Sequence, residues 1–173
     1  MPDCAAFIAT DLGRVVVTWN PARFPRVNRI YLPMSEEKMH AILADYQCVA
    51  LNLPPLADKL RDYFAGKKVN FSLDDLDFTG LTPFFQTVYR AAFRIPRGAV
   101  STYGALAKAA GSPHASRAVG QAMAKNPLPI VVPCHRVVRG DGHLGGFAGG
   151  LEQKRALLQL DGVKINDRLR VET

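Results

Sequence analysis

A nine-residue acidic stretch near the middle of the chain, SLDDLDFTG at residues 72–80, most constrains how this sequence can fold. It separates two parts of different charge. Residues 1–80 carry 9 basic and 10 acidic side chains, a net charge of −1, whereas residues 81–173 carry 13 and 5, a net charge of +8. Polar, turn-forming stretches of this kind join domains. We therefore predict one domain over residues 1–78 and a second over residues 79–173.

The first part has the pattern of an α/β domain. The β-branched residues 15–17 predict a strand, and Ser35 is a suitable N-cap for a helix with apolar residues at helical spacing from Met39 onward. A second helix is expected over residues 56–64, and a second strand at residues 69–71. This part contains no group of residues with obvious chemistry, so we expect it to be a scaffold.

The second part begins with a helix capped by Thr82 that ends near Ile95, because Pro96 follows. Two shorter helices are expected next, one capped by Ser101 or Thr102 and the other over residues 115–124. Two short helices joined by a tight, glycine-containing turn form a helix-turn-helix, although a plain helical hairpin has the same pattern. Small residues would let the second of these helices approach a partner closely: Ala115, Ser116, Ala118 and Gly120.

Cys134 lies in the most unusual segment of the sequence. Residues 130–132 predict a short buried strand that leads directly into Pro133-Cys-His-Arg136. A thiol becomes a nucleophile as a thiolate, which a neighbouring base or positive charge promotes. His135 and Arg136 could supply both. Residues 139–150 contain six glycines, a composition typical of a loop that passes close to another group, and a last helix is expected over residues 152–160.

The remaining cysteines, Cys4 and Cys48, show no regular spacing and no Cys-x-x-Cys pair. We therefore expect free thiols, no metal site and a reducing compartment. The start of the sequence lacks the basic and apolar segments of a signal peptide, and no apolar run would span a membrane. These features predict a soluble cytoplasmic protein. The basic second part suggests a polyanionic partner, although a solvated basic face has the same composition.

Three segments of the second part together resemble a known family. The residues from Arg117 to Val138, RAVGQAMAKNPLPIVVPCHRVV, are similar to the signature of O6-alkylguanine-DNA alkyltransferases. FAGGL at residues 147–151 and Lys154-x-x-Leu-Leu158 follow at that family's spacing. The resemblance covers about residues 82–162. It implies a ribonuclease-H-like α/β N-terminal domain followed by a mainly α, winged helix-turn-helix C-terminal domain.

The resemblance also implies a reaction. Cys134 would take the alkyl group from O6-alkylguanine, and possibly from O4-alkylthymine, in a single irreversible turnover that needs no cofactor. His135 would act as the base through a water and be oriented by Asp161, at a position where the family has glutamate. Asn126 would support the turn that holds the cysteine, and Tyr103 would protonate the departing base.

The implied partner is double-stranded DNA that contains alkylated guanine, bound by a monomer in the cytoplasm, or in the nucleus of a eukaryote. The target base must leave the stack to reach the thiol, and Arg117 would fill the gap. The helix would lie in the minor groove, where contacts distinguish bases poorly. Besides Tyr103 and Arg117, the expected DNA-binding residues are Ser116, Ala118 and Gly120.

The substrate pocket implied by the resemblance has apolar walls. Ala148 stands where the family often has serine, and its smaller side chain suggests a pocket that accepts bulkier alkyl groups. The expected lining residues are Met123, Pro129, Val137, Phe147 and Ala148.

Three other functions fit parts of the pattern. A protein that binds and flags alkylated DNA without transfer would be expected to lack Cys134. A helix-turn-helix transcription factor needs base-reading side chains, which the small second helix lacks. A Cys-His hydrolase would not require a basic helix-turn-helix beside its nucleophile.

Overall fold

The computed structural model describes residues 3–46, 48–49 and 53–172. The chain forms two compact units, the first from residues 1–79 and 127–131, the second from residues 80–126 and 132–173. The short segment 127–131 thus belongs to the first unit. The division predicted from the sequence, after residue 78, places this segment in the second domain.

The first unit is built on a four-stranded sheet of order β3-β2-β1-β4. Its strands are β1 (Cys4–Thr10), β2 (Gly13–Trp19), β3 (Arg29–Tyr31) and β4 (Cys48–Val49). The first three pair antiparallel, and β4 pairs parallel with β1. The strand predicted at residues 15–17 is confirmed within β2. The strand predicted at residues 69–71 is wrong: this segment has no strand partner, and the Phe71 ring instead packs against Tyr63, with 5.9 Å between centroids.

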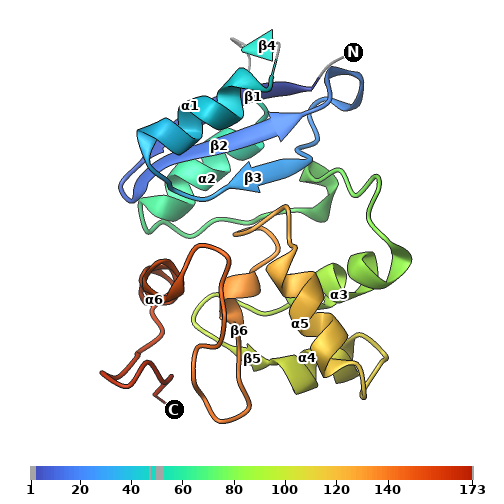
Figure 1. The fold of residues 1–173 in the computed structure, drawn as a ribbon, viewed down its shortest axis with the longest axis vertical. Helices are drawn as coiled ribbons and strands as arrows, with labels where there is room; N and C mark the ends of the chain where they lie inside the picture. The colour runs from blue at the N-terminus through green and yellow to red at the C-terminus, as the bar shows by residue number, and fades with distance from the viewer. Residues whose placement is uncertain (1–2, 47, 50–52, 173) are drawn as a thin grey trace. The chain divides into compact units, whose positions relative to one another are not determined.

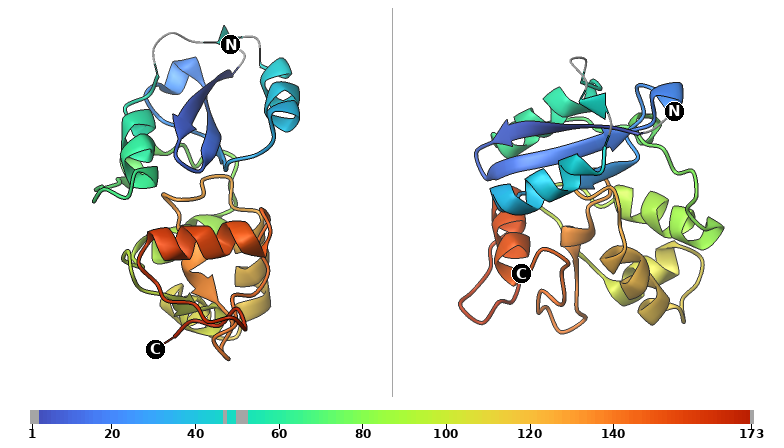
Figure 2. Two further views of the ribbon diagram at one scale, coloured as in Figure 1. Left: turned by 90° about the vertical axis from the view of Figure 1, so that its left-hand side faces the viewer. Right: turned by 45° about the horizontal axis from the view of Figure 1, so that its top comes forward.

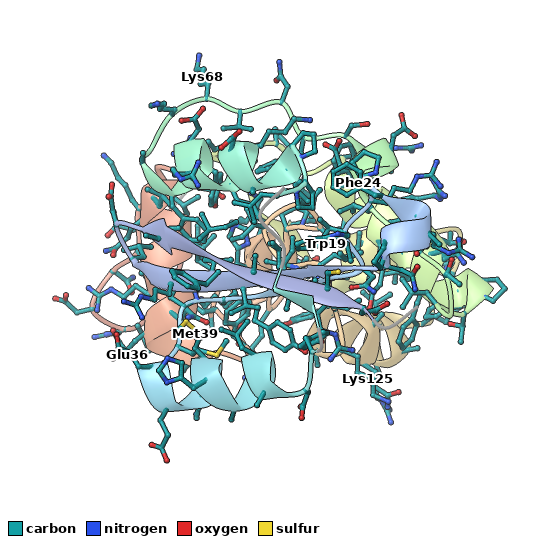
Figure 3. All side chains as sticks on the ribbon, turned by 90° about the horizontal axis from the view of Figure 1, so that it is seen from above. Trp19, Phe24, Glu36, Met39, Lys68 and Lys125 are labelled. Carbon is teal, nitrogen blue, oxygen red and sulfur yellow. The ribbon has the colours of Figure 1, made fainter. Side chains whose placement is uncertain are left out.

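Two helices lie on opposite faces of this sheet, α1 (Glu36–Ala44) and α2 (Leu56–Phe64) (Figure 2, left). Both predicted helices are confirmed, and the Ser35 side chain accepts a hydrogen bond from the Lys38 N–H as the N-cap. Met39 points from α1 towards the sheet and is buried against Ala5 and Val16 (Figure 3). Two single-turn 3-10 helices complete the unit, η1 (Pro21–Arg23) and η2 (Leu73–Asp75).

The expectation that all three cysteines are free thiols is wrong for Cys4, which is disulfide-bonded. The parallel pairing of β1 and β4 places the Cα atom of Cys4 opposite that of Cys48. The two Cα atoms are neighbours because of the register of the sheet, which cannot be predicted from the spacing of these cysteines in the sequence. Cys134 is free and buried.

The second unit is mainly helical. Its elements are α3 (Pro83–Phe93), β5 (Ser101–Thr102), α4 (Tyr103–Ala109), α5 (Ser116–Ala124), η3 (Cys134–Arg136), β6 (Val137–Val138) and α6 (Leu151–Leu160). A short parallel ladder of β5 and β6 lies between α6 and the helices α3, α4 and α5 (Figure 1). In the part of the chain that the structure describes, no helix is both long and apolar enough to cross a membrane.

The helices of the second unit follow the sequence pattern closely. Thr82 caps α3 through a hydrogen bond from the Phe85 N–H. Thr102, and not Ser101, caps α4, because its side chain accepts a 3.1 Å hydrogen bond from the Ala105 N–H. The last helix begins at Leu151, one residue before the predicted start, and ends at the predicted residue 160. Leu157 and Leu158 are fully buried, whereas Leu160 is half-buried.

The strand predicted at residues 130–132 is wrong, although the segment is buried as expected. Ile130 has a φ of +74°, which a strand cannot contain. The chain turns here, and the Asn126 side chain donates a 2.8 Å hydrogen bond to the Val132 carbonyl. The turn brings Asn126 back beside the segment that enters η3.

Candidate active site around Cys134

Cys134 is the first residue of η3, and only 6% of it is exposed. Its backbone N–H donates to the Val132 carbonyl at 2.8 Å. Burial raises the pKa of the thiol above its ordinary value, while a hydrogen bond from Asn126 and the charge of Lys154 oppose that rise. The thiol is therefore protonated at neutral pH and needs a base before it can act as a nucleophile.

His135 can be that base. Its side chain is fully buried, and Nε2 lies 2.9 Å from Asp161 Oδ2. Burial lowers the pKa of His135 and outweighs the opposing effect of Asp161, so the imidazole is neutral at pH 7. An ionised carboxylate only accepts hydrogen bonds. Nε2 must then carry the proton, which leaves the lone pair on Nδ1 to receive another.

Asp161 is the C-cap of α6, and its side chain has no exposed surface. Burial acts to raise its pKa, but hydrogen bonds from His135 and Arg136 outweigh burial and lower the pKa to about 2. The carboxylate is consequently ionised at all physiological pH values. Although shorter than glutamate, it reaches His135 at ordinary hydrogen-bond distance.

Arg136 binds Asp161 and a backbone carbonyl, although its position two residues after Cys134 suggested that its charge would act on the thiol. Its Nε donates to Asp161 Oδ2 at 2.6 Å, and a terminal nitrogen donates to the Ile95 carbonyl at 2.8 Å. The guanidinium therefore forms an ion pair with the Asp161 carboxylate. The cation whose charge favours the Cys134 thiolate is Lys154.

Lys154 is the functional residue that sequence reasoning missed. It is fully buried on α6, and its ammonium donates to the carbonyls of Val137 (2.7 Å) and Leu144. Burial lowers its pKa to about 8, while the charge of Cys134 acts to raise it. A signal was present in the sequence, because Leu157 and Leu158 at i+3 and i+4 place Lys154 on the apolar face of the helix.

Tyr103, at the start of α4, lies between two glycines. A Cβ atom on Gly145 would stand 3.4 Å from the Tyr103 hydroxyl, and one on Gly120 of α5 would stand 3.9 Å from its ring. Gly145 also has a φ of +72°, which favours glycine. Burial raises the pKa of Tyr103, and the charge of Cys134 adds to this effect, so the hydroxyl remains protonated and able to donate.

The other predicted site residues lie on α5, β6 and the glycine-rich loop. Ser116 and Arg117 are exposed in the first turn of α5, and Ala118 and Gly120 are half-buried on the same helix. Met123 and Val137 are buried, Phe147 is half-buried with its ring 6.0 Å from the Lys154 ammonium, and Ala148 is exposed. Pro129 is buried in the segment that belongs to the first unit.

In the second unit, Asn126 is hydrogen-bonded to Cys134, and the next residue along the chain, His135, is hydrogen-bonded to Asp161. Tyr103 and Lys154 are close enough to interact electrostatically with the thiol. Among the described residues, no three acidic, histidine or cysteine side chains gather in a way that could hold a metal ion. The arrangement is that of a buried thiol beside a neutral imidazole, which can deprotonate it when an electrophile arrives.

Replacing Lys154 with methionine should slow the reaction of Cys134 with a thiol-alkylating reagent at pH 7 by about tenfold. The loss of one charge interaction of about 1.4 kcal/mol has this effect on a rate. The pH at which the reaction reaches half its maximal rate should rise, because the thiolate loses the cation that stabilises it. The exposed Lys164→Met change is the matched control. An unaltered pH profile in folded Lys154→Met protein would contradict the role of the ammonium.

The buried carboxylate should make the protein sensitive to acid. Asp161 has a lowered folded pKa, so its contribution to stability is present above its unfolded value of 3.8 and is lost as the pH falls through about 2. Between pH 5 and pH 2, the free energy of unfolding should fall by about 2 kcal/mol more in the wild type than in Asp161→Asn. Urea titrations measure this difference, with Asp167→Asn as an exposed control. Parallel curves for wild type and Asp161→Asn would contradict the ion-pair assignment.

Comparison with known proteins places these features in a family. Residues 83–163 match the family described as 6-O-methylguanine DNA methyltransferase, DNA binding domain. The methylated-DNA–protein-cysteine methyltransferase of Salmonella typhimurium is 49% identical over 163 residues, covering 90% of this chain and 93% of that protein. The counterpart from Methanothermobacter thermautotrophicus is 42% identical over 118 residues, and the matched region spans 65% of each protein, just under two thirds of the relative's length.

Solved structures agree with the sequence relatives. The crystal structure of the Mycobacterium tuberculosis O6-methylguanine methyltransferase has a TM-score of 0.74 at 32% identity and covers 92% of both chains. The structure of Mycobacterium tuberculosis OGT in complex with DNA has a TM-score of 0.75 at 32% identity, covering 92% of this chain and 93% of that one. The shared architecture is an N-terminal antiparallel-sheet unit followed by a helical C-terminal unit. The chain therefore belongs to the O6-methylguanine-DNA methyltransferase family, also called methylated-DNA–protein-cysteine methyltransferases.

Proposed function

We propose that this protein repairs O6-alkylguanine in DNA by transferring the alkyl group irreversibly to Cys134. The observation that carries the proposal is the buried thiol beside His135, a neutral imidazole that Asp161 holds at 2.9 Å. Family membership supports the same reaction, and the Mycobacterium tuberculosis relative has been crystallised with DNA. O4-alkylthymine is a second substrate of the same chemical type.

The proposed step exchanges one bond for another. The bond from the alkyl carbon to guanine O6 breaks, and a thioether bond forms to the sulfur of Cys134. The thiol proton passes through a water to Nδ1 of His135, and the departing guanine receives a proton from the Tyr103 hydroxyl. Return of a proton from His135 to Tyr103 balances the reaction. Thioether formation consumes the acceptor, so each protein molecule acts once, as a monomer and without a cofactor.

DNA binding is assigned to the exposed face of α5. Ser116 and Arg117 stand in its first turn, and the small residues Ala118 and Gly120 allow close approach to the minor groove. Extrusion of the damaged nucleotide costs a few kcal/mol, and insertion of the Arg117 side chain into the vacated stack offsets part of it. The net charge of +8 over residues 81–173 favours the phosphate backbone.

We also propose functional and fold assignments for the two parts of the chain. Residues 1–78 form a scaffold of ribonuclease-H-like class, for which the mixed strand order β3-β2-β1-β4 is the support. Residues 79–173 form a winged helix-turn-helix domain, supported by the α4–α5 pair and the β5–β6 ladder. Since the substrate is genomic DNA, the protein belongs in the cytoplasm of a prokaryote or the nucleus of a eukaryote.

The proposed substrate pocket is lined mainly by apolar residues. Met123 and Val137 supply buried apolar surface, Phe147 and Ala148 belong to the glycine-rich loop, and Asn126 supports the turn before the nucleophile. Pro129 is the remaining lining residue of the proposal.

Transfer is tested directly by mass spectrometry. After incubation with a duplex oligonucleotide that contains one O6-methylguanine, the peptide with Cys134 should gain the mass of a single methyl group. The Cys134→Ala variant should bind the same duplex and gain no mass. If the wild type binds tightly yet gains no mass, the protein flags damage without transfer and the proposed reaction is wrong.

The small side chain of Ala148 leads to a prediction about alkyl groups. The wild type should repair O6-benzylguanine within about tenfold of its rate on O6-methylguanine, a difference in activation free energy of about 1.4 kcal/mol. Ala148→Ser should slow the benzyl reaction more than the methyl reaction. Single-turnover rates on both oligonucleotides measure this ratio, and a strong preference of the wild type for methyl would overturn the idea.

A further inference from the structure

The turn at residues 95–98, between α3 and β5, is packed against the C-terminal end of α6. Arg97 in this turn donates a 2.6 Å hydrogen bond to the Leu160 carbonyl, and its Nε lies 3.5 Å from Asp161 Oδ1. The backbone also comes close, since a Cβ atom on Gly98 would stand 3.5 Å from the Asp161 carbonyl oxygen. The Arg97 side chain therefore contacts both the backbone and the carboxylate at the end of α6.

The contact with Leu160 meets a general requirement of helix ends. The last four carbonyls of a helix lack intrahelical partners, and the terminal turn frays unless other groups satisfy them. Leu160 is the final residue of α6, and Asp161 is its C-cap. Arg97 supplies the donor that this end requires, and so fixes the backbone from which the Asp161 side chain projects.

The short side chain of Asp161 makes the position of this backbone important. A single methylene joins the carboxyl group to Cα, so a displacement of the backbone is passed almost undiminished to the oxygens. The two oxygens are also used differently. Oδ2 accepts from His135 and Arg136, whereas Oδ1 faces Arg97. A cation beside Oδ1 resists rotation of the carboxyl group, which would otherwise remove Oδ2 from the imidazole.

We infer that Arg97 is a positioning residue for alkyl transfer, because it holds Asp161, and through Asp161 the base His135, in the geometry that deprotonates Cys134. This inference rests on the proposed function. Arg97 does not touch the reacting atoms. Its contribution is to the rate of the chemical step and leaves DNA affinity almost unaltered.

Single-turnover kinetics with the full-length protein and an O6-methylguanine duplex separate these two quantities. Arg97→Ala should lower the transfer rate at saturating DNA by about 10- to 100-fold, by analogy with metal-ligating histidines, where loss of an outer-shell partner has an effect of this size. Its dissociation constant for DNA should stay within about threefold of the wild type, the allowance for one lost phosphate-attracting charge. Arg97→Lys, which keeps a cation within reach of Asp161, should recover most of the rate.

Arg94→Ala is the matched control, because this arginine is exposed at the end of α3 and its loss removes the same charge. Arg94→Ala should transfer at the wild-type rate. The inference is overturned if Arg97→Ala transfers as fast as Arg94→Ala, if its defect lies wholly in the dissociation constant, or if Arg97→Lys is as slow as Arg97→Ala.

Nitrogen-15 NMR of the His135 ring tests the positioning without DNA. The wild type should show one tautomer, protonated on Nε2, and Arg97→Ala should show exchange between tautomers at pH 7. A changed His135 signal in Arg97→Ala, in a protein whose wild type transfers no alkyl group, would support the positioning role and overturn the proposed function. Normal transfer by the wild type with an unchanged signal in Arg97→Ala would overturn the positioning role alone.

Discussion

A fully buried carboxylate holds together three parts of the second unit. Asp161 ends α6, His135 and Arg136 belong to η3, and Arg97 comes from the turn after α3. Moving a charge out of water costs several kcal/mol, and removal of one partner from a buried ion pair typically costs about 3–5 kcal/mol. The carboxylate is therefore tolerated only with its partners in place, so the contacts that stabilise the fold also hold the His135 ring against Asp161.

Burial keeps Cys134 and His135 in their uncharged forms. Burial raises the pKa of Cys134 and lowers that of His135, so the pair is a thiol and a neutral imidazole before substrate arrives. Such a thiol reacts slowly with adventitious electrophiles and oxidants. Lys154 moderates this protection, because its ammonium favours the thiolate without exposing it to solvent.

Local signals predicted most helices well, since caps and apolar periodicity depend on neighbouring residues. Ser35 and Thr82 cap their helices as expected. The proximity of Cys134 and His135 was also predictable, because the two residues are adjacent in sequence. Residues 130–132 were misassigned, since a short apolar run is compatible with a buried strand or a buried turn. The family resemblance suggested the contact of Asp161 with His135. Its contacts with Arg97 and Arg136, and the charge of Lys154 near the thiol, depend on how α6 packs, which local sequence does not encode.

The segment 127–131 gives the chain an unusual connectivity. It leaves the second unit just before the nucleophile, belongs to the first unit, where the Ile30 N–H donates to the Pro127 carbonyl at 2.8 Å, and then returns. Leu128, Ile130 and Val131 are buried in it. A protein that lacked residues 1–79 would keep every side chain of the candidate site but lose most of the unit to which these apolar residues belong. No single cut in the chain therefore separates the two units without dividing the first one.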